Sequence, residues 1–345
     1  MSVLRPGSAA VRWLVPAAAA VVVIGGGAAA GTIVANAGPT LPERTAAQLL
    51  VDIQHTKVDG LSGTFVATVD VGLPAVAGLA KGAGGAAALA GLLAGNNTAR
   101  VWHSGAGKER LAVLSTLGET DIIRDGPDVW LWNSADEKAS HLTLPGAAGP
   151  EPAGPPEVAA AALAAITPTT RVETAGAVRV AGRDAYELVL GPRDPATLIG
   201  QVRLAIDAGT HLPLSVDIYA ANATRPGVRI AFQQISYAVP DDEQFVFNPP
   251  PGTTTTEGDV GGPAGQVHPS VVGAGWTAVV EARLPKGQLT TAGNALPRVS
   301  GAWGSGRLFT GPLLSVLVTD GGAVFAGPVT PARLYEVAGA ARPAR

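Results

Sequence analysis

The sequence has no cysteine among its 345 residues, and this absence excludes several kinds of site at once. Disulfide bonds, thiolate metal centres and lipid attachment at a lipobox cysteine all require that residue. The five histidines fall on different predicted elements without ligand spacing, so we expect no metal and no cofactor. A chain of this length can be stabilised by burial of apolar surface alone.

The sequence also lacks an excess of positive charge and the motifs of common enzymes. Removing residues 1–37 takes away two arginines and no acidic residue, which leaves 22 basic against 27 acidic residues. Such a balance gives no electrostatic reason to bind nucleic acid. No Gly-x-Ser-x-Gly elbow is present, and the Gly105-Ala106-Gly107-Lys108 segment lacks the leading glycine of a phosphate loop. We therefore predict a protein that is not an enzyme.

One long uncharged run, from Trp13 to Val34, follows Arg5 and Arg12. At ~1.5 Å per helical residue it is long enough to span a bilayer core. The small-x-small pattern Ala35-Asn36-Ala37 comes directly after it, as in a signal peptidase site. A cleaved signal peptide and a retained N-terminal membrane anchor both remain open. In either case we expect an exported protein at the extracytoplasmic face of the cell membrane.

After a predicted helix over 42–57, with Pro42 at its first position, the hydrophobic period changes from helical spacing to two. Short Gly- and Asp-containing gaps separate the segments of period two, which is typical of antiparallel hairpins. A phase shift in the last segment predicts a β-bulge at Gln233-Gln234. A further helix is expected near 157–166. The eleven predicted strands are 61–71, 98–104, 108–117, 119–124, 128–134, 138–144, 171–180, 184–190, 201–207, 212–219 and 228–237.

This pattern predicts an α+β fold that is mostly β. We expect a long curved antiparallel sheet that forms an incomplete β-barrel covered by helices, plus a small C-terminal α/β unit. The predicted domains are a signal or anchor at 1–37, a half-barrel at 38–248, a Pro/Gly/Thr linker at 249–266 and an accessory unit at 267–345. Within that unit we predict a hairpin at 313–329 and a helix from Pro331 to about Ala340, and residues 276–282 are a candidate for another helix.

Residues 73–95 interrupt the strands with a segment made almost entirely of Ala, Gly and Leu. Leu89, Leu92 and Leu93 are candidates for a short amphipathic lid helix over an apolar cavity, or for a surface that touches membrane. The alternative is an insertion that packs on the sheet without a role.

An aromatic stripe marks the candidate ligand pocket. Trp130 and Trp132 share one face of their strand, and Trp102 and Leu142 are candidates to join them. Phe65, Leu111, Ile122 and Leu188 are further pocket candidates. The alternative is an ordinary hydrophobic core.

These segments resemble the LolA-like family, including its RseB-like members, and most closely the actinobacterial ones. The resemblance covers most of residues 40–340. It is carried by RVWHSGAGKERLAVLSTLGETDIIRDGPDVWLWNS, VAGRDAYELVLGP, VRLAIDAGTHLPLSVDIYA, FNPPPG and GAWGSGRLFTGPLLSVLVTDGG. It implies an incomplete barrel whose concave face holds acyl chains. The Ala/Gly-rich insertion and the segment after residue 266 depart from the simple carrier.

The function that we predict is a non-catalytic lipid- or lipoprotein-binding protein of the cell envelope, which holds acyl chains in a hydrophobic half-barrel. Burial would stabilise such chains by roughly 0.8 kcal/mol per CH₂. The alternative is an RseB-like extracytoplasmic sensor that acts through a membrane protein partner such as an anti-sigma factor. A hydrolase without a recognisable site is a third possibility.

Overall fold

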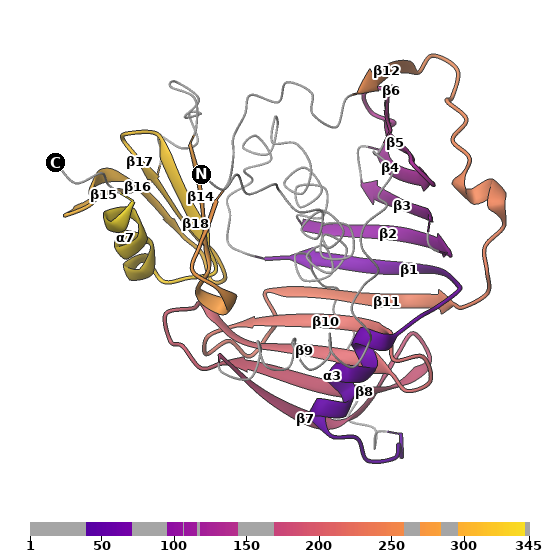
Figure 1. Cartoon of the computed structure of the whole chain (residues 1–345), viewed down its shortest axis with the longest axis horizontal. Coiled ribbons are helices and arrows are strands. Elements are labelled where there is room, and N and C mark those ends of the chain that lie inside the picture. Colours follow the sequence, from indigo (N-terminus) through magenta and orange to yellow (C-terminus); the bar gives the residue numbers. More distant parts are fainter. Residues whose placement is uncertain are drawn as a thin grey trace, which may run out of the picture.

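A computed structural model of the chain describes residues 39–70, 95–105, 107–115, 118–143, 169–258, 270–283 and 296–341. They form two sheets, one of twelve strands and one of six (Figure 1). The large sheet has the order β12-β6-β5-β4-β3-β2-β1-β11-β10-β9-β8-β7. Its strands are β1 (Gly60–Val69), β2 (Gly95–Ser104), β3 (Lys108–Ser115), β4 (Gly118–Asp125), β5 (Asp128–Asn133), β6 (Lys138–Thr143), β7 (Thr170–Val180), β8 (Arg183–Pro192), β9 (Ile199–Asp207), β10 (Pro213–Ala220), β11 (Val228–Ser236) and β12 (Thr254–Gly258).

The large sheet confirms the predicted fold class. It is long and curved, and it remains open because its edge strands β7 and β12 do not pair with each other (Figure 1). Every pairing is antiparallel except one, since β12 runs parallel to β6 at the edge. The sheet is therefore mixed, a detail that the hairpin pattern did not reveal. All eleven predicted strands are present, and β12 lies within the predicted linker, whose domain boundaries stay a prediction.

Helix α3 (Ala46–His55) covers the part of the sheet around β8 and β9 (Figure 1). Its residues Leu49 and Leu50 are buried against Leu188 and Ile206. The expected start at Pro42 is wrong, because Thr45 caps the helix. The Thr45 hydroxyl accepts a hydrogen bond from the backbone N–H of Gln48, and the Gln48 side chain accepts one from the backbone N–H of Thr45. This capping box fixes the first helical residue at Ala46, four residues later than predicted.

The second sheet has the order β13-β14-β18-β17-β16-β15, with helix α7 (Pro331–Ala340) packed on it. The predicted hairpin and the helix beginning at Pro331 are confirmed. The possible helix over 276–282 is wrong, because a short 3₁₀ turn, η2 (Gly275–Thr277), is followed by β14, which pairs with β13 and β18. The strands are β13 (Ser270–Val272), β14 (Val279–Arg283), β15 (Arg298–Gly301), β16 (Gly304–Thr310), β17 (Ser315–Thr319) and β18 (Ala323–Gly327).

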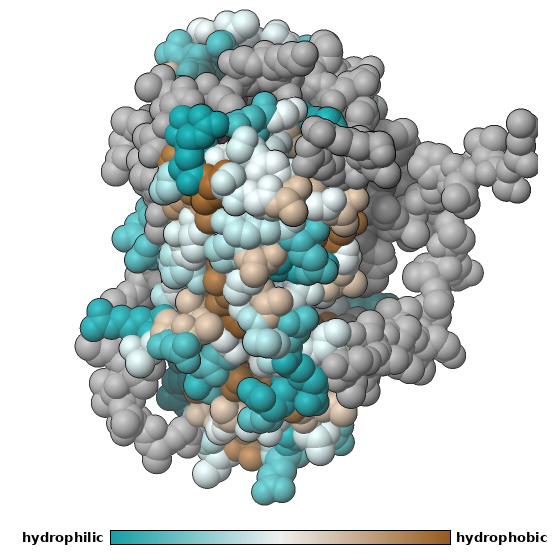
Figure 2. Space-filling model, turned by 90° about the vertical axis from the view of Figure 1, so that its left-hand side faces the viewer, coloured by the Kyte–Doolittle hydropathy of each residue, from teal (hydrophilic) through white to brown (hydrophobic). Residues whose placement is uncertain are grey.

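Direct contacts join the second sheet to the first. The backbone N–H of Leu198 donates to the Pro328 carbonyl at 2.8 Å, and that of Thr330 donates to the Ala196 carbonyl at 2.9 Å. Leu313 is buried among the side chains of Val202, Val216, Ile218 and Val228 on the large sheet. Seen from the side of β15–β18 and α7, hydrophobic residues form only separate small areas on a mostly hydrophilic or neutral surface (Figure 2).

Three predictions lie outside the described residues: the N-terminal segment, the insertion at 73–95 except for Gly95, with Leu89, Leu92 and Leu93, and the helix at 157–166. Within the parts of the chain that the structure describes, none of the helices is long and apolar enough to cross a membrane.

Candidate functional site

The two faces of the sheet differ in chemistry from β11 through β1 to β3. One face carries an apolar cluster in which Phe65, Ala67, Ala99, Val113 and Ile230 are buried. The cross-strand pairs Phe65↔Ala99 and Ala99↔Val113 place these side chains together. Because side chains alternate along a strand, the residues between them point to the opposite face, which is more polar.

The register divides the predicted pocket residues between these faces. Phe65 and Leu111 belong to the apolar cluster, and the pairings extend its face to Ile122 and Leu142. Leu188 lies farther along the sheet, beneath α3. Trp102, Trp130 and Trp132 lie on the opposite face. The eight residues therefore do not surround a single cavity, and a ligand-lining role for any of them stays a prediction.

Two of the tryptophans are covered by the chain itself. Trp130 stacks on His141 with ring centroids 4.3 Å apart and lies 4.9 Å from Phe247. Phe247 also lies 6.5 Å from Trp132. Phe245, which ends the 3₁₀ turn η1 (Asp242–Phe245), is buried. The segment after β11 thus folds back over β3–β5, as in an ordinary aromatic core.

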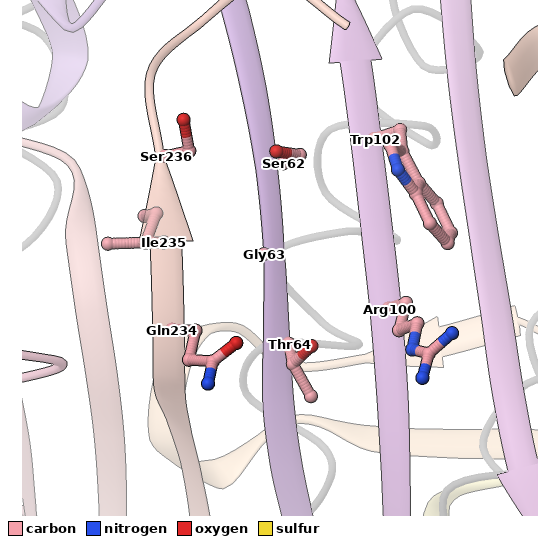
Figure 3. A pocket seen from close by; sticks show the side chains of 8 residues that line it. All are labelled: Ser62, Gly63, Thr64, Arg100, Trp102, Gln234, Ile235 and Ser236. Atoms are coloured by element: carbon pink, nitrogen blue, oxygen red, sulfur yellow. The ribbon is translucent and has the colours of Figure 1, made fainter.

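Trp102 instead lines an open pocket of about 450 Å³ on this face (Figure 3). The pocket spans β11, β1 and β2. Across these strands, Ser236, Ser62 and Trp102 form one row, and Gln234, Thr64 and Arg100 form the next. Gly63 and Ile235 complete the lining.

A β-bulge shapes the pocket. Thr64 pairs with Gln234 while Phe65 pairs with Phe232, which leaves Gln233 as the extra residue and confirms the predicted bulge. Beneath the pocket, the Phe232 ring packs against Gly63, where an added Cβ would lie 2.8 Å from the ring. Bulges often occur beside functional sites because they re-aim neighbouring side chains.

A buried ion pair positions Trp102. The guanidinium of Arg110 lies 5.3 Å from the centre of the Trp102 ring, and its Nη2 donates to Asp121 Oδ2 at 2.6 Å. Burial raises the pKa of Asp121 to about 6, and the facing Arg110 only partly offsets this effect. Arg110 is thereby engaged, so it does not add a free charge to the pocket.

Among the described residues that line the pocket, Arg100 alone is charged, and its side chain is exposed. Among the described residues it has no ion pair or hydrogen bond, and the same is true of the Thr64 and Gln234 side chains. The pocket thus combines a free guanidinium, hydroxyl groups, an amide and the Trp102 ring, a set suited to binding an anion. Sequence analysis missed Arg100 and Gln234, although Arg100 shares the strand parity of Trp102.

A second polar cluster lies on β8–β11. Arg203 donates to Glu187 at 3.2 Å, and Arg229 lies 3.2 Å from Asp217. Burial raises the pKa of Asp217 to about 6, with partial compensation by Arg229. Each of the two acidic side chains of this cluster is paired with an arginine, so neither arginine is a free cation that could bind an anionic ligand. No group of three potential metal ligands is found in the described part of the chain.

Comparison with known families gives one match: the MucB/RseB N-terminal domain family matches residues 94–244, the stretch from β2 to η1. This match confirms the resemblance to the LolA-like and RseB-like group. It extends over less than half of the chain. None of the curated proteins compared with the chain matches it.

Several solved structures resemble the chain. The MucA/MucB complex of Pseudomonas aeruginosa has a TM-score of 0.47 at 16% identity, covering 85% of this chain and 96% of that one. A conserved protein from Thermus thermophilus has a TM-score of 0.35 at 12% identity, covering 61% and 98%. A LolA superfamily protein from Nitrosomonas europaea has a TM-score of 0.23 at 14% identity, covering 59% and 99%. Because all three scores lie below 0.5, the fold rests on the strand order of the chain itself.

Proposed function

We propose that the protein is an RseB-like, non-catalytic regulator of the cell envelope that binds a membrane-anchored partner protein. The observation that carries this proposal is the MucB/RseB family match over residues 94–244. The N-terminal segment, with its positive flank and uncharged run, supports a position outside the cytoplasm.

The second sheet supports the binding of a partner protein rather than simple lipid carriage. Its backbone hydrogen bonds to residues 196–198 and the buried Leu313 attach it firmly to the large sheet. A partner that contacts both sheets would therefore meet one continuous surface rather than two loosely tethered units.

The test is purification of the full chain from detergent-solubilised envelopes, followed by reconstitution with the purified candidate partner. The expected result is a single membrane protein at a fixed ratio that re-forms the complex from pure components. Recovery of the chain without such a protein, or a partner that fails to bind when pure, would count against the proposal. Turnover of ester substrates would contradict the non-catalytic part.

A second candidate function, lipid or lipoprotein carriage, is favoured by a different observation. Buried apolar side chains run along one face of the sheet, from Val113 through Phe65 to the residues beneath α3. Apolar surfaces of this kind hold acyl chains by burial. Mass spectrometry of organic extracts from the purified protein tests it. A stoichiometric lipid would support carriage, whereas lipid-free protein would count against it.

A further inference from the structure

We infer that the pocket on β11, β1 and β2 binds an extended segment of the partner protein through a carboxylate side chain held by Arg100. This inference rests on the proposed function, because it names the chemistry by which the partner would be recognised.

The hydrogen-bond donors of the pocket are free to bind a ligand. Arg100 is exposed and, within the described residues, unpaired, whereas the neighbouring Arg110 is engaged by Asp121 and by the Gln244 carbonyl. Thr64 lies beside Arg100 in the same row, and Gln234 lies on the far side of Thr64; they offer a hydroxyl and an amide (Figure 3). An anion placed there meets several donors without breaking an existing ion pair.

The charge of the pocket matches that of a single carboxylate. The lining residues that the structure describes contain one positive charge and no carboxylate. A monoanionic carboxylate is neutralised by one guanidinium, which binds both of its oxygens through parallel N–H groups. A phosphate with two negative charges would keep one of them uncompensated in this pocket. The observations therefore favour an acidic side chain over a phosphate group.

The spacing of the two rows of side chains matches that of an extended peptide. Arg100 and Trp102 are two residues apart on β2, so their side chains lie roughly 7 Å apart along the strand direction. Alternate side chains of an extended peptide have the same spacing. A peptide along β2 that places its acid on Arg100 therefore places the side chain two positions away against Trp102. The expected motif is an acidic residue two positions from an apolar one.

The pocket is also preorganised, because contacts within the protein fix the Trp102 ring and the floor of the pocket. Arg110 holds the Trp102 ring, and Gly63 lets Phe232 pack directly beneath the floor. A site whose groups are fixed before binding loses less conformational entropy when the ligand arrives.

The experiment is an NMR titration of the folded protein, followed at the Trp102 indole N–H resonance, which is assigned with Trp102→Phe. The probe is the blocked peptide acetyl-Gly-Ser-Glu-Ser-Val-Ser-Gly-amide, compared with the same peptide carrying Gln in place of Glu. We expect a saturable shift with the Glu peptide and at least a roughly tenfold weaker response with the Gln peptide.

Two charge reversals complete the test. Arg100→Glu is expected to weaken binding of the Glu peptide about tenfold or more, because the anion then meets a like charge. Arg225→Glu is the matched control, since Arg225 is also exposed but lies in the turn before β11, at the strand end far from Ser236. It should change the affinity by less than about twofold. Circular dichroism confirms that both variants are folded.

Three outcomes would overturn the inference: no saturable shift, equal binding of the Gln peptide, or equal binding by Arg100→Glu. A shift produced only by inorganic phosphate or by phosphatidylglycerol vesicles, and lost in Arg100→Glu, would overturn it in favour of a phosphate site. Capture of the membrane partner by Arg100→Glu at native strength would also overturn it, while leaving the proposed regulator function intact.

Discussion

The fully buried carboxylate of Asp207, the last residue of β9, stabilises the turn that leads to β10. It accepts hydrogen bonds from the backbone N–H groups of Gly209 and Thr210, both at 2.8 Å, and from the Arg183 guanidinium. Arg183 in turn lies 4.7 Å over the ring of Tyr237. Burial by itself would raise the pKa of Asp207, but the hydrogen bonds outweigh it and lower the pKa to about 2.

Replacing Asp207 with Asn is expected to lower the free energy of unfolding by about 2–4 kcal/mol at pH 7, because it leaves Arg183 without its charged partner. Chemical denaturation measures the change. The matched control is Asp184→Asn, whose exposed pair with Arg179 should contribute less than about 1 kcal/mol. Equal decreases in the free energy of unfolding of the two variants would show that the buried ion pair stabilises the fold no more than the exposed one.

At the candidate site, the sequence predicts which residues of one strand share a face, but not which residues of two strands pair. Strand parity already separates Val101 from Trp102, and the phase shift located the bulge at Gln233-Gln234. The sequence of a single strand does not determine its register with the neighbouring strand, however. The pairing of Trp102 with Ser62 rather than with Phe65 could therefore not be predicted. For the same reason, the pocket set in the sequence analysis combined residues from both faces.

Among the elements, the strands of the large sheet were predictable because turn residues separate segments with a clear period of two. In the second sheet the β17–β18 hairpin was predicted from its turn, whereas β15 and β16, which are short and contain glycine, were not predicted. The structure gives the reason for one glycine: a Cβ at Gly306 would lie 2.3 Å from the Val318 carbonyl oxygen of β17. No hairpin turn connects β12 to its parallel partner β6, so the pairing of β12 at the sheet edge could not be predicted from the sequence either.

The edge strand β12 is held by a histidine between two carboxylates. His141 Nδ1 lies 3.0 Å from Glu257 of β12, and its Nε2 lies 3.0 Å from Asp128 of β5. Partial burial would lower the pKa of His141, but the hydrogen bonds with Glu257 and Asp128 outweigh it and raise the pKa above 6.5. The protonated ring donates to both carboxylates, whereas the neutral ring has only one N–H.

We therefore expect β12 to open more often as the pH rises through the raised pKa of His141. Hydrogen exchange of the amides in Thr254–Gly258, corrected for the intrinsic rate, should show less protection at pH 8 than at pH 5.5. His141→Gln should show low protection at both values, and His55→Gln, in α3, should behave as the native protein does. Protection that does not depend on pH in the native protein would contradict this role of His141.

The attachment of the second sheet to the first depends on Leu313. Leu313→Ala removes a side chain that is only 6% exposed, which is expected to cost about 2–5 kcal/mol. If the two sheets unfold together, a single denaturation transition should shift to lower denaturant concentration. Val280→Ala, at a side chain that is 41% exposed, is the control and should change stability by less than about 0.5 kcal/mol. Two separate transitions, with the large sheet unaffected, would contradict cooperative unfolding.

At the scale of the whole molecule, several titrating groups act on stability in the same direction. Asp121 and Asp217 are buried carboxyls whose pKa is raised to about 6, and the pKa of His141 is also raised. Each of these groups binds its proton more tightly in the folded state than in the unfolded chain. Their contributions to stability are therefore largest at acidic pH and are lost as the pH rises through the folded pKa. Asp207 acts oppositely, but only between about pH 2 and its unfolded pKa of 3.8.

These effects together predict maximum stability at about pH 3.5–4, where Asp207 is ionised in the folded state and Asp121 and Asp217 are still protonated, rather than at neutral pH. Between pH 5 and pH 8 the free energy of unfolding should fall by about 2–4 kcal/mol, mostly because Asp121 and Asp217 ionise without full compensation by Arg110 and Arg229. Urea denaturation across this range measures the slope. Asp217→Asn should make the slope shallower, because an amide does not titrate, whereas Asp184→Asn should leave it unchanged. A protein that is more stable at pH 8 than at pH 5 would show that the two arginines neutralise their partners more effectively than burial disfavours them.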